Sequence, residues 1–532
     1  MLERAGKQAQ SKWEVVPATW PLRGLLFIVF SFGIGLRITS LAKGGLFQDD
    51  AWVALTGTVP FSKALHMAGT APGFVGLLHA WLPFNSTSAT WAALPALLFG
   101  LVGIFLAFPT FRLLELSERS AAVGAVLFAI SPVAIATSGH VKQYSLDASL
   151  SFLLLGGFVV ARQRHGRWLV ALGVVSVAGL WCSASVVPVV AAVWLLLLSD
   201  AVSNPDVRRQ LMIAAGATGG ALALLVVACY SNLPIALRRF WADHLLSPSP
   251  WSTLPHRIDT VVRGLTVGLI PTSTSLPHEV LLVTLLLGAL VLLSLSRLRS
   301  RPGVALAWTV LGMAILAAVL GRIPLGTGRT DMAIYPALIL LVVAGGEVAI
   351  DQVARRTPSF LLASQVLVAI LLVVGLTTAV SERRPYPTTP IRKALVVAKG
   401  CVDVHQLPAV VVIDAYSRYP YALTTPRTIE EKFSRQYGAG FTVVSTTSTF
   451  ILPAQPYERP YTPQLWAHHV AAFTLGTGAI NARRGTAVAY VQTPPDGIGN
   501  VDDFARALER EHFALTSSAT VGPLVIGCYE AD

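Results

Sequence analysis

Apolar runs long enough to cross a lipid bilayer recur along the first 380 residues of this 532-residue chain. A membrane-spanning helix needs about 20 apolar residues, because the hydrocarbon core is roughly 30 Å thick and a helix rises about 1.5 Å per residue. Charged residues make up 13% of the chain, whereas about 25% is usual in soluble proteins. The sequence therefore predicts a polytopic α-helical membrane protein.

The apolar runs predict about eleven membrane-spanning helices after a polar, basic N-terminal segment, residues 1–20. The predicted spans are residues 21–41, 90–113, 121–137, 146–160, 168–181, 186–198, 211–230, 280–295, 304–320, 332–350 and 360–380. Each short loop on the side of the N-terminus carries two or three arginines, and basic residues collect in cytoplasmic loops. This regularity predicts a plasma-membrane protein with a cytoplasmic N-terminus. It also explains the net charge of +12 without a nucleic-acid partner.

Two long loops are expected on the outer side, residues 42–88 and 231–278. Within the first loop, residues 72–84 are apolar but too few to cross the membrane, which predicts a re-entrant or interfacial helix. The 21–380 region is thus predicted to be one transmembrane domain with its functional loops outside the cytoplasm.

From residue 381 to residue 532 the chain is no longer apolar enough to span. Strand-like runs such as 409–413 and 486–491 alternate with helical stretches such as 501–511. This alternation predicts a C-terminal α/β domain, and eleven spans would place it outside the cytoplasm. Its two cysteines, Cys401 and Cys528, could form a disulfide bond in an oxidising compartment or remain two buried thiols.

Two adjacent acids, Asp49 and Asp50, follow the first predicted span. Acidic side chains at membrane depth are costly, so a pair there is a candidate functional site. Asp49 is predicted to be a catalytic base. The alternative is that the two acids cap an interfacial helix beginning at Ala51, since aspartate is a good N-cap residue.

Nucleotide and zinc sites are not indicated by the sequence. It contains no glycine-rich phosphate loop of standard spacing followed by its lysine or acid, and no Cys/His set with zinc-ligand spacing.

Four short motifs occur in a characteristic order after the basic N-terminus and the first span. They are Asp49-Asp50-Ala51-Trp52, the stretch APGFVGLLHAW at residues 71–81, Ser131-Pro132, and Lys142-Gln143-Tyr144-Ser145-Leu146. Over about residues 20–350 the chain resembles the GT-C superfamily of membrane glycosyltransferases, in particular the bacterial branch akin to protein O-mannosyltransferases and lipid A aminoarabinose transferases. The usual acid pair there is Asp-Glu, so the role of Asp50 is less defined than that of Asp49.

The resemblance implies a polyprenyl-phosphate-linked sugar donor and an acceptor outside the membrane. Cations at the depth of the lipid headgroup would bind the donor phosphate, and arginine can do so through two parallel hydrogen bonds. The candidates are Lys142 and Arg329, with Tyr144 beside them and Arg322 as a weaker one. The alternative for these cations is snorkelling of their side chains to the interface.

The acceptor site is expected to involve residues of the two outer loops. The candidates are His66, His79, Asp243 and His244. Asp331 is expected to neutralise the neighbouring Arg329. Asp50 would orient Asp49, bind the acceptor or hold a divalent cation, and such a cation is a possible cofactor.

These expectations combine into an inverting glycosyltransferase of cell-envelope glycan assembly, with an arabinan- or mannan-type polysaccharide or a glycolipid as the favoured acceptor. A single base and direct displacement invert the anomeric carbon, and a phosphate leaving group needs cations rather than a general acid. The composition also suggests an actinobacterial origin. The alternatives are a lipid-linked sugar flippase or transporter, which usually shows paired halves, and a non-catalytic assembly protein whose tail binds glycan.

Overall fold

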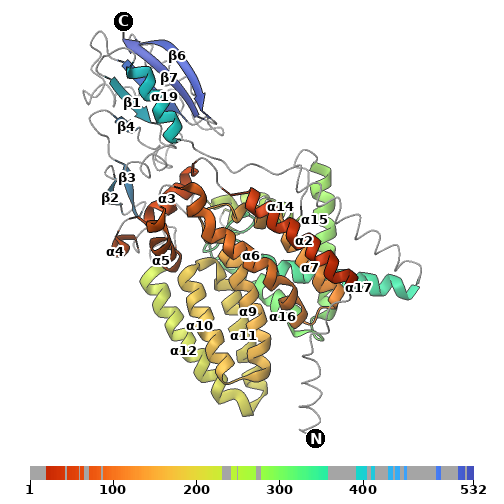
Figure 1. Ribbon diagram of the computed structural model, residues 1–532. Helices are drawn as coiled ribbons and strands as arrows, with labels where there is room; N and C mark the ends of the chain where they lie inside the picture. The colour runs from red at the N-terminus through yellow and green to blue at the C-terminus, as the bar shows by residue number, and fades with distance from the viewer. Residues whose placement is uncertain are drawn as a thin grey trace.

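A computed structural model describes most of the helical region and the regular elements of the C-terminal domain (Figure 1). The described residues are 20–41, 45–58, 60–64, 71–85, 88–230, 241–247, 250–270, 277–356, 391–403, 409–413, 429–434, 438–443, 449–451, 487–492, 513–521 and 524–531.

The helical region begins with α2 (Trp20–Thr39) and a group of short helices that follow it. These are α3 (Gln48–Thr56), α4 (Phe61–Ala64), α5 (Pro72–Trp81) and η1 (Leu82–Phe84). Long helices then alternate with short connections. They are α6 (Ala89–Leu113), α7 (Glu118–Ile130), α8 (Pro132–Thr137), α9 (Tyr144–Arg164), α10 (Arg167–Cys182), η2 (Ala184–Val186), α11 (Val187–Ser203), α12 (Pro205–Tyr230), η3 (Ala242–His244), η4 (Trp251–Thr253), α14 (Leu254–Leu269), α15 (Pro277–Ser294), η5 (Leu295–Arg297), α16 (Pro302–Val319) and α17 (Tyr335–Arg356).

Seven helices within the described residues are long and apolar enough to cross a membrane, and two shorter apolar ones, in α2 and α10, accompany them. The seven lie in α6, α9, η2–α11, α12, α15, α16 and α17. The prediction of a multi-pass helical membrane protein is confirmed. The predicted span 360–380 lies outside the described residues.

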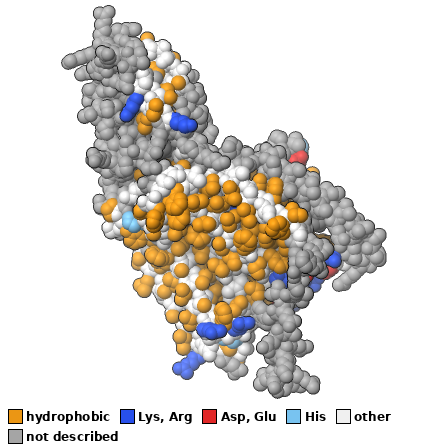
Figure 2. Space-filling view, in the orientation of Figure 1, with side chains coloured by type: hydrophobic (Ala, Val, Ile, Leu, Met, Phe, Trp, Pro, Cys, Tyr) orange, Lys and Arg blue, Asp and Glu red, His pale blue; other side chains and the backbone are white. Residues whose placement is uncertain are grey.

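Hydrophobic side chains cover the flank of the helical domain, as Figure 2 shows. Lys and Arg side chains gather at the end of that domain that lies away from the C-terminal domain, which is called the sheet domain below. A lipid-facing apolar belt with basic side chains at one end is the arrangement that a membrane protein requires.

The predicted third span, residues 121–137, is not one continuous helix. It breaks between α7 and α8 at Ser131-Pro132, because proline has no N–H to continue the helical hydrogen bonds. The hydroxyl of Ser131 accepts from the Ala134 N–H at 3.4 Å and donates to the carbonyl of Gly268 at 2.8 Å. The break therefore starts a new helix and ties it to α14.

Arg37 of α2 is fully buried against this break. Its guanidinium donates to the carbonyls of Ala129 (2.6 Å), Phe128 (3.1 Å) and Gly33 (3.2 Å). The Phe128 carbonyl would normally accept from the residue four positions on, which is Pro132. Arg37 thus supplies the donor that the proline lacks.

A close main-chain contact fixes the loop that follows α8. A Cβ atom on Gly139 would overlap the carbonyl of Ser40, and the hydroxyl of Ser40 donates to the carbonyl of Ile135 at 3.1 Å. Only glycine allows this approach, so the end of α2 fixes the start of the 138–143 loop.

The C-terminal domain contains a five-stranded sheet in the order β4-β1-β5-β7-β6, with strand β1 (Ala409–Ile413) parallel to both of its neighbours. The other strands are β4 (Thr449–Ile451), β5 (Ala487–Gln492), β6 (Phe513–Val521) and β7 (Leu524–Ala531), and a separate antiparallel pair is formed by β2 (Ile429–Ser434) and β3 (Gly438–Val443). Helix α19 (Ile391–Asp403) packs on β5 and β7. The predicted α/β fold of the tail is confirmed, whereas the predicted helix 501–511 lies outside the described residues.

The predicted disulfide bond concerns Cys401 on α19 and Cys528 on β7. Cys528 is disulfide-bonded, and the side chain of Cys401 lies outside the described part of the structure. The pairing of these two cysteines stays a prediction. The sheet domain lies beyond the end of the helical domain that carries α3 and α5 (Figure 1).

Candidate functional site

The two adjacent acids lie in the first turn of α3, which begins at Gln48. The N-cap position is Phe47, and no side chain caps the helix. The alternative that the acids cap a helix beginning at Ala51 is therefore wrong. Asp49 and Asp50 are helical residues whose side chains diverge, because successive residues of a helix point about 100° apart.

Asp50 points into the protein and is fully buried. Its Oδ1 accepts from the Val141 N–H at 3.1 Å, and its Oδ2 lies 2.8 Å from His140 Nδ1. Since an ionised carboxylate only accepts, the Nδ1 nitrogen carries the proton of this hydrogen bond. Asp50 thereby joins α3 to the loop between α8 and α9.

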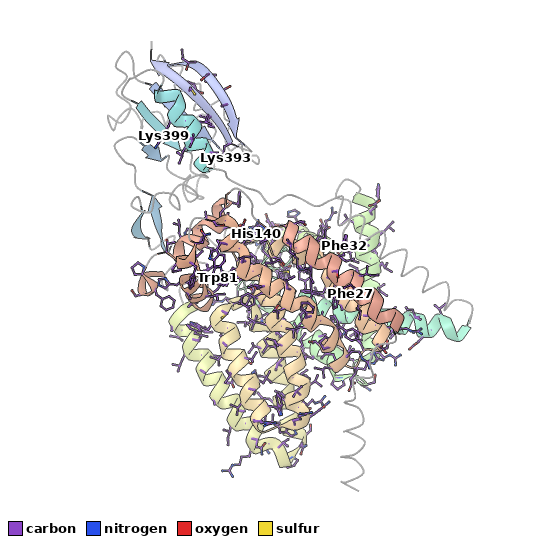
Figure 3. The ribbon with its side chains drawn as sticks, viewed as in Figure 1. Phe27, Phe32, Trp81, His140, Lys393 and Lys399 are labelled. Carbon is purple, nitrogen blue, oxygen red and sulfur yellow. The ribbon has the colours of Figure 1, made fainter. Side chains whose placement is uncertain are left out.

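His140 was not among the residues predicted for the site. Its imidazole is about one fifth exposed, at 21%, and it lies at the end of the helical domain facing the sheet domain (Figure 3). The only hint of its role in the sequence is its position two residues before Lys142. A single histidine has no spacing pattern that reveals its partner, so its contact with Asp50 could not be predicted from the sequence.

Asp49 points outward, with its side chain 51% exposed, and its Oδ2 lies 3.3 Å from Nη1 of Arg329. Arg329 is 280 residues away in the sequence, on the loop between α16 and α17. Asp49, predicted from its motif, and Arg329, predicted as a cation at headgroup depth, thus meet at one place.

A cavity of about 350 Å³ opens beside these residues. Its charged and polar lining comprises Asp49, Asp50, Thr137, His140, Lys142, Tyr144, Thr327 and Arg329, and its apolar lining includes Phe47, Val133, Ala136 and Val267. The apolar residues other than Phe47 come from α8 and α14. The cavity therefore places cations, carboxylates and an apolar wall around one space.

Lys142 lies at the wall of this cavity with 9% of its surface exposed. Its Nζ is 5.9 Å from the centre of the Trp52 ring, a distance at which the ring face attracts a cation. Burial lowers the pKa of Lys142, while Asp49 and Asp50 act to raise it and Arg329 lowers it further. Desolvation dominates, so Lys142 gives up its proton more readily than an exposed lysine does.

The expectation that Asp331 neutralises Arg329 is wrong. The carboxylate of Asp331 accepts from the N–H groups of Gly326 (3.1 Å) and Arg329 (3.0 Å) and from the hydroxyl of Thr327 (2.9 Å). The carboxylate of Asp331 thus accepts its hydrogen bonds from groups of its own turn. The guanidinium of Arg329 contacts Asp49 instead.

Among the other predicted residues, those that the structure describes do not line the cavity. The side chain of Arg322 is exposed, and His79 of α5 packs against the Phe61 ring at 6.0 Å. Asp243 is exposed, whereas His244 Nδ1 donates to the Leu325 carbonyl at 3.0 Å, close to the Arg329 loop. His66 lies outside the described residues.

The sequence left open a divalent cation held by Asp50, and the described residues around Asp50 can be compared with a metal site. In the described part of the chain no three His, Cys, Asp or Glu side chains converge as a metal site. Both oxygens of Asp50 accept from Val141 and His140, and the guanidinium of Arg329 adjoins Asp49. A cation bound by Asp49 or Asp50 would have to displace these donors.

No protein-family model matches the chain, and no curated protein matches its sequence. Several solved structures, in contrast, are similar to this chain. ArnT from Cupriavidus metallidurans bound to undecaprenyl phosphate is 13% identical with a TM-score of 0.50, over 95% of this chain and 98% of that one. The Archaeoglobus fulgidus oligosaccharyltransferase is 15% identical (TM-score 0.44; 75% of this chain, 61% of that one), and the arabinofuranosyltransferase AftD from Mycobacteria is 15% identical (TM-score 0.41; 96% and 41%).

This chain spans 61% of the length of the oligosaccharyltransferase and 41% of AftD. ArnT, in contrast, is matched over nearly its whole length. At these identities a match establishes the fold alone. With the motif order found in the sequence, the match to ArnT shows that this chain has the fold of the GT-C glycosyltransferases.

Proposed function

We propose that this protein is an inverting glycosyltransferase that moves a sugar from a polyprenyl-phosphate donor to an extracytoplasmic acceptor. The observation that carries the proposal is the cavity in which the carboxylate of Asp49 faces Lys142 and Arg329 beside an apolar wall. The apolar wall suits the lipid part of such a donor, and the two cations suit its phosphate.

The lining of the cavity supports this donor class. A phosphodiester carries one negative charge, and Lys142 and Arg329 offer two cations that could bind it. Val133, Ala136 and Val267 would contact the first apolar units of the lipid. The ArnT structure of the same fold contains undecaprenyl phosphate, which supports this class of lipid.

The chemistry assigned to Asp49 is proton removal. As the acceptor hydroxyl attacks the anomeric carbon, its proton passes to the Asp49 carboxylate, and the bond from that carbon to the phosphate oxygen breaks. The electron pair stays on the phosphate, where Lys142 and Arg329 stabilise the added charge. One base and one displacement invert the anomeric configuration.

The resting contact between Asp49 and Arg329 has a consequence for this scheme. The carboxylate and the guanidinium are 3.3 Å apart and both partly exposed, so the contact is weak in free energy and an incoming phosphate can replace it. When the phosphate takes the guanidinium, Asp49 is left to face the acceptor.

Asp50 is assigned a positioning role. Although Asp50 borders the cavity, both of its oxygens already accept from His140 and Val141, so its carboxylate holds α3 against the loop that carries Lys142. The acceptor is proposed to be a large envelope glycan or glycolipid, since the 381–532 domain would stand outside the membrane beside the cavity. As the sequence suggests, we propose that residues 21–380 form the catalytic domain and that residues 381–532 form this outer domain.

The test is transfer from radiolabelled polyprenyl-phosphate sugars (arabinose, mannose, glucose and aminoarabinose) to envelope fractions, with purified protein in lipid discs. Wild type should transfer label from one donor. Asp49→Asn should lower kcat by about 100-fold or more, the usual contribution of a general base, while donor binding is retained.

The matched control is Asp259→Asn, which changes an exposed acid paired with Arg263 on α14 and should leave transfer unchanged. Asp50→Asn should reduce both transfer and thermal stability, because it disturbs a buried hydrogen-bond network. Undiminished transfer by Asp49→Asn would remove it as the base. Movement of the lipid-linked sugar across vesicles without a new glycosidic bond would instead establish the flippase.

A further inference from the structure

The 326–331 turn carries Arg329 and forms part of the cavity lining. Gly326 and Gly328 have φ angles of +69° and +65°, a left-handed conformation that favours glycine. Between them, Thr327 lines the cavity together with both glycines. The turn therefore contributes main chain to the cavity wall, and Arg329 follows directly after its second glycine.

Two side chains of the turn hold its main chain. The Thr327 hydroxyl accepts from the N–H groups of Arg329 and Thr330, each at 3.0 Å, and donates to Asp331 at 2.9 Å. Asp331, with 1% of its surface exposed, accepts from the same Arg329 N–H at 3.0 Å. The main chain of Arg329 is thus held by both residues at once.

The turn is also seated directly on α14. A Cβ atom on Gly264 would overlap the carbonyl of Gly326, and one on Gly326 would overlap the main chain of Val261. At its start, the Leu325 N–H donates to the His244 carbonyl at 2.9 Å. The Cα atom of Arg329 is consequently fixed relative to the apolar wall of the cavity.

The guanidinium itself is held much more loosely. It is 41% exposed, and its described contact is the 3.3 Å one to Asp49. A flexible side chain loses conformational entropy when it binds a ligand, and that cost is smaller when its backbone is already fixed in the right place. The rigidity of the turn should therefore contribute to anion binding.

We propose that Thr327 and Asp331 are positioning residues that set the place of Arg329 in the cavity and thereby the affinity for the phosphate group of a lipid. The proposal rests on the proposed function for the identity of the anion. It assigns Thr327 an indirect action, through the main chain of Arg329, although its side chain borders the cavity.

The experiment measures binding of undecaprenyl phosphate, without a sugar, to purified full-length protein in lipid discs. Thr327→Val keeps the shape of the side chain and removes the hydroxyl, so affinity should fall roughly 3- to 10-fold, as expected for the loss of hydrogen bonds that fix the turn. Thr327→Ser keeps the hydroxyl and should bind like wild type. Thr309→Val in α16, whose hydroxyl donates to the Ala305 carbonyl at 2.8 Å, is the matched control and should also bind like wild type.

A double-mutant cycle separates positioning from direct contact. In an Arg329→Gln background, which should itself bind weakly, Thr327→Val should cause no further loss. Asp331→Asn provides a second route if Thr327→Val does not fold, and its loss of affinity should likewise disappear in that background.

The outcomes distinguish the two proposals. If wild type does not bind the lipid phosphate, or Arg329→Gln binds it as well as wild type, the donor assignment fails. If Arg329→Gln loses binding but Thr327→Val does not, the positioning proposal is overturned. Full additivity in the cycle, or failure of Thr327→Ser to retain affinity, overturns it as well.

Discussion

Asp49 and Asp50 occupy consecutive positions in α3, and their surroundings separate their roles. The carboxylate of Asp50 is enclosed by Val141 and His140, whereas that of Asp49 is half exposed at the cavity. A buried carboxylate that loses a hydrogen-bond donor is left unsatisfied, which costs free energy, so Asp50 is held in its position. Asp49 is free of that constraint and can exchange partners during a reaction.

The role of Lys142 in binding the lipid phosphate can be tested by the pH dependence of that binding. Burial lowers the pKa of its ammonium group, so the neutral form appears at a lower pH than for an exposed lysine. Undecaprenyl phosphate is a phosphate monoester whose second ionisation, with a pKa of about 6, is largely complete by pH 7, so its charge changes little at higher pH. Affinity for undecaprenyl phosphate should therefore be full at neutral pH and should fall as the pH rises through the lowered pKa.

Isothermal or filter-binding titrations from pH 7 to pH 10 measure this dependence. Lys142→Arg is the matched variant, because arginine stays protonated throughout. It should remove the alkaline decline of affinity, whatever its affinity at neutral pH. An identical decline in Lys142→Arg would mean that another group is responsible.

At the scale of elements, the break between α7 and α8 shapes the site. Pro132 ends α7, and α8 and the following loop then turn toward the cavity with Val133, Ala136 and His140. Arg37 of α2 meets the carbonyls that the break exposes. An arginine within an apolar helix, normally a sign of function, here completes the hydrogen bonding of a neighbouring helix.

Arg37→Met should lower the thermal stability of the purified protein. The side chain keeps much of its volume, but the carbonyls of Phe128 and Ala129 lose their donor, at a cost of about 1–3 kcal/mol for each buried unsatisfied group. The matched control is Arg263→Met, which removes an exposed ion pair with Asp259 and should shift stability by less than about 0.5 kcal/mol. Equal melting temperatures for wild type and Arg37→Met would contradict this account.

For the whole molecule, the two domains are joined through residues outside the described part, and the sheet domain lies at the end of the helical domain that carries α3 (Figure 1). Helix α19 packs on strand β7, which places the chain around Cys401 beside the strand of Cys528. Disulfide bonds persist in oxidising compartments. The predicted bond is thus linked to the predicted location of this domain outside the cytoplasm.

Peptide mapping of protein alkylated in intact cells tests both expectations. Without reduction, one peptide pair joined through Cys401 and Cys528 should be found. In Cys401→Ser, Cys528 should become open to alkylation. Cys182, a half-buried free thiol in the helical domain, serves as the internal control and should react equally in both proteins. Two alkylated thiols in wild type would contradict the pairing and remove this support for an outer location.

The sequence by itself determined the membrane class, most helix positions, the α/β character of the tail and the residues Asp49, Lys142, Tyr144 and Arg329 of the cavity. These are recoverable because hydropathy, strand-like runs and short motifs are local properties of the chain. The tertiary structure alone decided that Asp50 binds His140, that Asp331 holds its own turn, and that α14 forms a wall. Such contacts join residues far apart in sequence through main-chain groups and glycine approaches, which leave no periodic pattern, so they exist only once the helices have packed.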